Sequence, residues 1–95
     1  MLRRLLKGRR DSTRIVYKIL LTARVGVTKT RIVRYVNLNF ELAGQYVKDL
    51  VSIGLLEKNK NSIGRTTYQV TDRGSRLFSH LEQVEKELWL GVEGI

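Results

Sequence analysis

The sequence predicts a mainly α-helical domain that carries one small β-hairpin, with its elements in the order α-α-α-β-β-α. Three observations lead to this prediction. The 95 residues suffice for a single domain with one core. Apolar residues recur at helical spacing in four segments. One polar turn that contains a glycine separates two short runs, of which the second is rich in β-branched and aromatic residues.

The first helix is expected over residues 13–25. Ile15, Ile19 and Ala23 recur at positions i, i+4 and i+8, which places them on one face of a helix. Ser12 is a residue type that commonly caps the start of a helix, and Gly26 is one that commonly follows its end. We therefore expect an amphipathic helix whose apolar face needs other elements to cover it.

Two further helices follow after short polar breaks. Thr28 is expected to cap the second helix, which runs to Val36, and Asn39 is expected to cap the third. Gly54 is expected to end the third helix, because glycine readily adopts the left-handed conformation found there. The residues expected to point inward from the third helix are Ala43, Val47, Leu50 and Ile53.

The hairpin is expected from residues 55–58 and 66–70, and a last helix from Asp72 to about Leu90. A short hairpin is unstable alone and must pack on the core, here through Leu56, Tyr68 and Val70. Three helices and a hairpin form the winged helix-turn-helix plan. We divide the chain into a basic N-terminal arm (1–11), a winged-helix domain (12–70), and a C-terminal dimerisation helix with its tail (71–95).

Positive charge is concentrated at one end of the chain. The net charge is +9, yet residues 1–34 hold eleven basic residues and one acidic residue, a net charge of +10. A basic block on an otherwise neutral chain indicates a polyanionic partner, for which we favour nucleic acid. An anionic membrane or an acidic protein are the alternatives.

Several classes of function are excluded by composition. The chain has no Cys and a single His, His80, so it lacks disulfides, thiolate metal sites and a His pair. No grouping of catalytic residues is evident, and we expect no enzyme, no cofactor and no metal site. No apolar run approaches the roughly 20 residues that span a bilayer, and we expect a cytoplasmic, nucleoid-associated protein.

The exposed face of the third helix is the candidate for reading DNA bases. Gln45 can bond an adenine edge, Leu42 can contact a thymine methyl, and Tyr46 can bond a phosphate. Tyr46 packing on the first helix, and a face that is merely solvated, are the alternatives. The predicted base contacts are Glu41, Leu42, Gln45 and Tyr46. The predicted backbone contacts are Thr28, Lys29, Thr30, Arg31, Arg34, Asn39 and Lys48.

Two basic segments flank this helix-turn-helix. The hairpin turn offers Lys58, Lys60, Asn61 and Arg65, which suit a minor groove or its phosphates, although a solvated turn explains them too. The arm offers Arg3, Arg4, Arg9 and Arg10, which suit a minor groove, or a general attraction to DNA.

The last helix is the candidate for self-association. Its apolar residues follow helical spacing and form a seam that a second copy of the chain can cover. Packing of the same seam on the first helix is the alternative. The predicted interface residues are Leu77, Leu81, Val84, Leu88 and Trp89.

Three strings in the sequence resemble archaeal winged-helix DNA-binding proteins. They are residues 28–39 (TKTRIVRYVNLN), 50–56 (LVSIGLL) and 68–74 (YQVTDRG). The resemblance covers residues 12–85 and is nearest to small ten-kilodalton nucleoid-associated proteins whose C-terminal helix forms a coiled-coil dimer. It implies a homodimer that binds double-stranded DNA, as a transcriptional regulator or as a coating protein. An RNA- or protein-binding module of a larger assembly is the alternative function.

Overall fold

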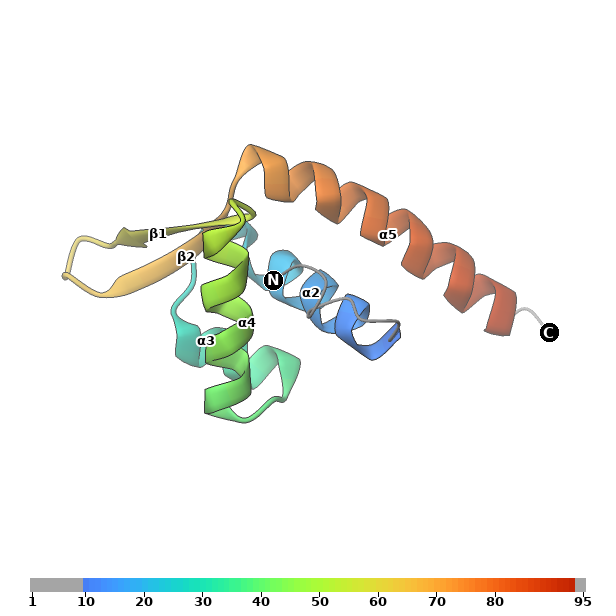
Figure 1. Ribbon diagram of the computed structural model, residues 1–95, viewed down its shortest axis with the longest axis horizontal. Coiled ribbons are helices and arrows are strands. Elements are labelled where there is room, and N and C mark those ends of the chain that lie inside the picture. Colours follow the sequence, from blue (N-terminus) through green and yellow to red (C-terminus); the bar gives the residue numbers. More distant parts are fainter. Residues whose placement is uncertain (1–9, 94–95) are drawn as a thin grey trace.

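The computed structural model has the predicted order of elements, α-α-α-β-β-α, with a mainly helical fold (Figure 1). It describes residues 10–93, and side chains within residues 12–87. No helix in this described part is both long and apolar enough to cross a membrane. The elements are α2 (Arg10–Thr22), η1 (Ala23–Val25), α3 (Lys29–Val36), α4 (Phe40–Ser52), β1 (Leu56–Lys60), β2 (Thr66–Val70) and α5 (Asp72–Glu93).

Helix α2 provides the centre of the core. Its residues Val16, Ile19 and Leu20 are fully buried, as is Ala23 at the start of η1, because α3 and α5 pack against α2. The helix starts at Arg10, three residues earlier than the sequence predicts. Ser12 therefore lies inside the helix and is not its N-cap, which corrects the prediction.

The predicted caps of α3 and α4 are confirmed. The Thr28 hydroxyl accepts a hydrogen bond from the Arg31 N–H at 3.4 Å, and the Asn39 side-chain oxygen accepts one from the Leu42 N–H at 2.7 Å. Between the two helices, Asn37 adopts the left-handed conformation with φ 56°. These local interactions set the turn between α3 and α4.

The hairpin is joined to the body of the molecule by a third piece of backbone. Strands β1 and β2 pair antiparallel, with Leu56 opposite Val70 and Lys60 opposite Thr66. Val27, just before α3, pairs with Tyr68 through two backbone hydrogen bonds of 3.0 and 2.7 Å. This bridge holds the wing, residues 56–70, next to the start of α3.

The start of α5 is fixed against the loop that precedes the wing. The Thr71 hydroxyl donates to the Gly54 carbonyl at 2.6 Å and accepts from the Gly74 N–H at 3.0 Å. Gly74 is buried, and a Cβ on it would overlap the Leu55 carbonyl oxygen and lie 2.9 Å from a methyl group of Val70. Only glycine lets the helix approach this closely.

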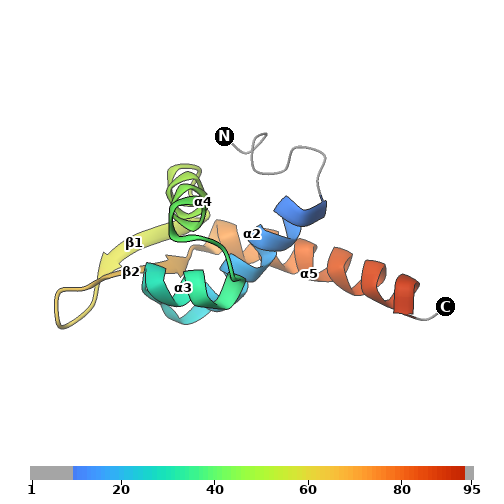
Figure 2. The same cartoon turned by 90° about the horizontal axis from the view of Figure 1, so that it is seen from below.

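Further along, α5 packs beside α2 (Figure 2). The Phe78 ring stacks on Tyr17, with centroids 5.3 Å apart and planes inclined by 3°. Burial, followed by the nearby charges of Glu82 and Glu85, raises the pKa of Tyr17 above its ordinary value. The Tyr17–Phe78 stack anchors the first half of α5 to the core.

The residues of the apolar seam predicted on α5 differ in their burial. Leu81 is only 9% exposed and belongs to the core of its own chain, which for this residue favours the alternative of packing within the chain. Leu77 is partly buried, whereas Val84 is 46% exposed. The side chains of Leu88 and Trp89 lie outside the described residues.

The close approach at Gly74 gives a prediction for stability. Gly74→Ala places a methyl group on a backbone oxygen, so we expect a loss of about 1–3 kcal/mol in the free energy of unfolding. Gly44→Ala is the matched control, because its Cβ would meet only the Lys29 side chain, at 3.5 Å. This control should gain about 0.5–1 kcal/mol from helix propensity. Urea unfolding measures both, and a Gly74→Ala protein as stable as the wild type would contradict the packing described.

Candidate nucleic-acid interface

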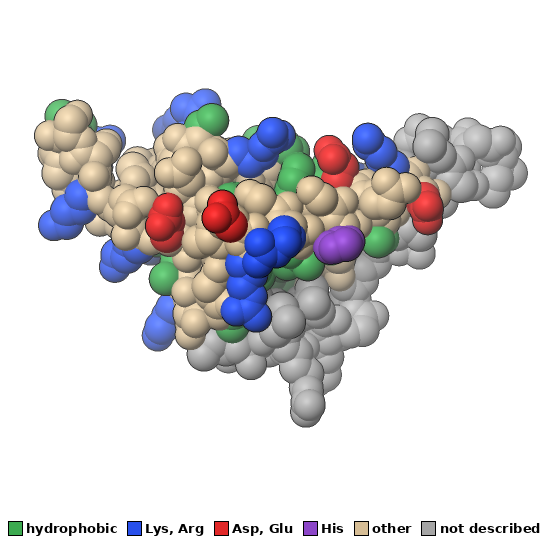
Figure 3. Space-filling view, turned by 90° about the horizontal axis from the view of Figure 1, so that it is seen from above, with side chains coloured by type: hydrophobic (Ala, Val, Ile, Leu, Met, Phe, Trp, Pro, Cys, Tyr) green, Lys and Arg blue, Asp and Glu red, His purple; other side chains and the backbone are tan. Residues whose placement is uncertain are grey.

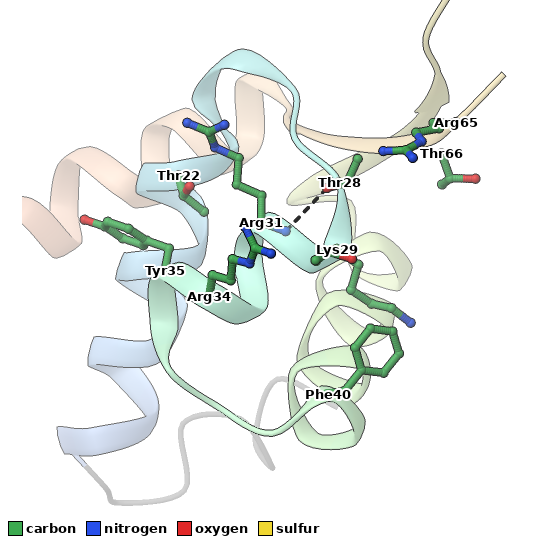
Figure 4. A pocket seen from close by; sticks show the side chains of 10 residues that line it. Thr22, Thr28, Lys29, Arg31, Arg34, Tyr35, Phe40, Arg65 and Thr66 are labelled. Carbon is green, nitrogen blue, oxygen red and sulfur yellow. Dashed lines mark hydrogen bonds between the residues drawn. The ribbon is translucent and has the colours of Figure 1, made fainter. Parts of the chain in front are cut away.

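A hollow between α3 and the wing gathers positive charge from distant parts of the chain (Figure 4). Lys29, Arg31 and Arg34 come from α3, and Arg65 comes from the wing. No acidic residue of the described part of the chain lines this first hollow. Thr28 and Thr30, from the start of α3, also line it, so five of the predicted backbone contacts lie together.

The start of α3 adds to this positive potential. The first N–H groups of a helix lack partners within the helix, and the helix dipole favours an anion there. One of these groups, the Arg31 N–H, already donates to Thr28. A phosphate in the first hollow would therefore meet both helix backbone and guanidinium groups.

Two exposed aromatic residues line this hollow, and neither is among the site residues predicted from the sequence. Phe40 is 56% exposed and Tyr35 is 49% exposed. The Lys29 ammonium lies 4.4 Å from the centre of the Phe40 ring, a cation–π contact that orients the charge. The spacing of Phe40 to Ala43 and Val47 would place it on the buried stripe, so no sequence signal indicates its exposure.

A second hollow lies between α4 and the wing. Glu41, Gln45 and Lys48 line it from α4, and Lys58 and Tyr68 line it from the wing. Lys29 lines both hollows, so the two are neighbours and form one continuous surface, here called the basic surface. Leu42 is 38% exposed and belongs to the same exposed part of α4.

The wing has one positively charged face. Because side chains alternate along a strand, Lys58 and Lys60 share the face of Leu56, which points to the core. Glu57 and Asn59 lie on the other face. The positive face is the one turned toward α4, since Lys58 lines the second hollow.

Two residues predicted to contact DNA make hydrogen bonds within the fold, and for Tyr46 the alternative of packing on the first helix is the one observed. Tyr46 is only 8% exposed, and its hydroxyl donates to the Ser12 hydroxyl at 3.2 Å, so it packs on α2 and is not on the base-reading face. The Asn61 side-chain oxygen accepts from the N–H groups of Ile63 and Arg65, at 3.1 and 2.9 Å. Asn61 thus holds the turn of the wing.

Asn39 and the arginines of the basic arm are the other residues predicted to contact DNA. Asn39 is exposed, with its side-chain oxygen occupied as the cap of α4. Arg3, Arg4 and Arg9 lie outside the described residues, and the side chain of Arg10 does too. Contacts made by the basic arm remain a prediction.

Comparison with known proteins identifies the family. The family model for winged helix-turn-helix proteins matches residues 9–88. The chain belongs to the winged helix-turn-helix family. The fold class and the resemblance predicted from the sequence are thereby confirmed. In winged-helix terms, α3 and α4 are the helix-turn-helix pair and the β1–β2 hairpin is the wing.

Solved structures of winged helix-turn-helix proteins are similar to this chain. Sso10a-2, a DNA-binding protein from the archaeon Sulfolobus solfataricus, is 25% identical with a TM-score of 0.70, over 86% of this chain and 88% of its own. The antibiotic resistance repressor MarR is 16% identical with a TM-score of 0.72, over 81% of this chain. This chain spans 59% of the MarR chain.

A third similar structure contains a nucleic acid. It is a mutant of Staphylococcus aureus MepR bound to an oligodeoxyribonucleotide, 12% identical with a TM-score of 0.70, over 97% of this chain and 68% of its own. At such identities MarR and MepR establish a shared fold alone. A search of curated proteins gave no match.

Proposed function

We propose that this winged-helix protein binds double-stranded DNA as a transcriptional regulator or a nucleoid-associated protein in the cytoplasm. The basic surface carries this proposal, because it joins cations of α3, α4 and the wing around one exposed helix face. The similarity to Sso10a-2, a DNA-binding protein, supports it. We assign the chain no enzymatic activity, since its function lies in binding.

In this proposal α4 enters the major groove. Its exposed residues Leu42, Gln45 and Lys48 recur every three positions, so they form one narrow stripe. Gln45 would bond an adenine edge and Leu42 would contact a thymine methyl. Glu41, beside them, suits a cytosine amino group.

The remaining cations would bind the sugar-phosphate backbone. Arg31 and Arg34 of α3, together with Arg65 of the wing, would bind the phosphates of one DNA strand in the first hollow. Lys58 and Lys60 would bind further phosphates of the same DNA strand, toward the minor groove. The alternative, an RNA-binding module, does not require a base-reading stripe such as that of α4.

Salt dependence and two substitutions test this assignment. With six to ten phosphate contacts, affinity should fall about 10³–10⁵-fold between 50 and 200 mM salt. Arg31→Ala should weaken binding to all duplexes alike and reduce the salt slope by about one. Gln45→Ala should cost about 1–3 kcal/mol on a selected site and little on random DNA.

Fluorescence anisotropy measures these affinities after selection of a preferred site from random duplexes. Arg76→Ala is the matched control, because it removes the same charge from exposed α5, outside the basic surface. An Arg76→Ala loss as large as that of Arg31→Ala would contradict the assigned surface. Stronger competition by an RNA duplex than by a DNA duplex of matched sequence would favour the RNA-binding module.

We also propose that α5 pairs with α5 of a second copy. Figures 1 and 2 both show the C-terminal half of α5 extending beyond the start of α2. Val84, in that half, is 46% exposed, and the sequence continues with Leu88, Trp89 and Leu90. Burial of such side chains is favourable by about 1.5–3 kcal/mol each. A two-fold dimer would present two α4 helices to pseudo-palindromic DNA.

Sedimentation equilibrium tests the dimer. We expect the wild type to be dimeric at micromolar concentration and Val84→Glu to shift it toward monomer, because a charge would be buried at the interface. Ser79→Glu is the control, since Ser79 is exposed on a different side of the same helix. A monomeric wild type, or a Val84→Glu protein as dimeric as the control, would overturn this interface.

A further inference from the structure

The outer end of the wing carries an apolar residue. Ile63 is 75% exposed, on a hairpin that projects from the body of the molecule (Figures 1 and 2). Seen from above, a hydrophobic side chain lies at this outer end (Figure 3). Ile63 is the one apolar side chain in the turn of residues 61–65, where the other side chains are polar or charged.

The turn that presents Ile63 is held in one shape. Asn61 takes part in four hydrogen bonds within the turn. Its side-chain oxygen accepts from the N–H groups of Ile63 and Arg65, and its own N–H donates to the Arg65 carbonyl at 2.9 Å. Gly64 donates to the Asn61 carbonyl at 3.0 Å and takes φ 82°, a conformation that favours glycine. Ile63 is also β-branched, so its side chain has little rotational freedom.

Cations stand on both sides of this apolar tip. Lys60 ends β1 and is exposed, and Arg65 precedes β2 and lines the first hollow. If Lys60 and Arg65 bind phosphates at the edge of the minor groove, the tip between them lies over that groove. The Ile63 side chain has no atom that can bond a phosphate or a polar base edge. In a minor groove, which presents no thymine methyl group, it can contact only sugars and the faces of stacked bases.

We propose that Ile63 is a wedge that enters the minor groove and partly separates two stacked base pairs. The proposal rests on the DNA binding proposed above. Apolar side chains that act in this way kink DNA by about 20–90° toward the major groove. Pyrimidine–purine steps unstack most readily, so the wedge makes the wing sensitive to sequence without a hydrogen bond to any base.

DNA topology tests the wedge without knowledge of the binding site. A plasmid is relaxed by a topoisomerase with saturating protein, and the change in linking number is measured after the protein is removed. Ile63→Ser should lower the change per bound protein by more than half, while its affinity for duplex DNA falls less than tenfold because the cations remain. Ile63→Leu, which keeps an apolar wedge, should retain the change.

Val25→Ser is the matched control, because Val25 is 81% exposed and lies outside the wing. It should behave as the wild type does. A wild type that binds DNA but leaves the linking number unchanged, or an Ile63→Ser protein that changes it as the wild type does, would overturn the wedge and leave DNA binding intact. A wild type that binds no duplex would overturn the proposed function as well.

Discussion

The two backbone hydrogen bonds between Val27 and Tyr68 determine where the wing stands, and the basic surface depends on them. Val27 directly precedes the cap of α3, so the bridge sets the wing beside the start of that helix. Arg65 and Arg31 then line one hollow although 34 positions separate them in the chain. Neither the hairpin alone nor the helix pair alone would create this surface.

Helix α4 must serve both the core and the proposed interface. Ala43, Tyr46, Val47, Asp49 and Leu50 are all buried, so most of its circumference is committed to packing. The exposed face of α4 is therefore narrow, and only a few of its side chains can reach DNA bases. The α5 side of the molecule differs, because acidic and basic side chains are mixed there (Figure 3).

Features determined by near neighbours were predictable from the sequence. The caps Thr28 and Asn39 bond residues three positions ahead, and the strands of the wing are adjacent in the chain. Features that depend on distant partners were not. The sequence left DNA contact and packing on the first helix both open for Tyr46, and the contact that distinguishes them, with Ser12, comes from 34 residues away. Helical spacing alone likewise cannot show that Leu81 is buried and Val84 is not.

The most direct test of the basic surface is a titration with duplex DNA followed in ¹⁵N–¹H correlation spectra of the protein. We expect the largest amide shifts at the start of α3, along the exposed stripe of α4 and in the turn of the wing. The outward face of α5, around Arg73 and Arg76, should change little. Shifts concentrated on that face of α5, with α4 and the wing unmoved, would contradict it.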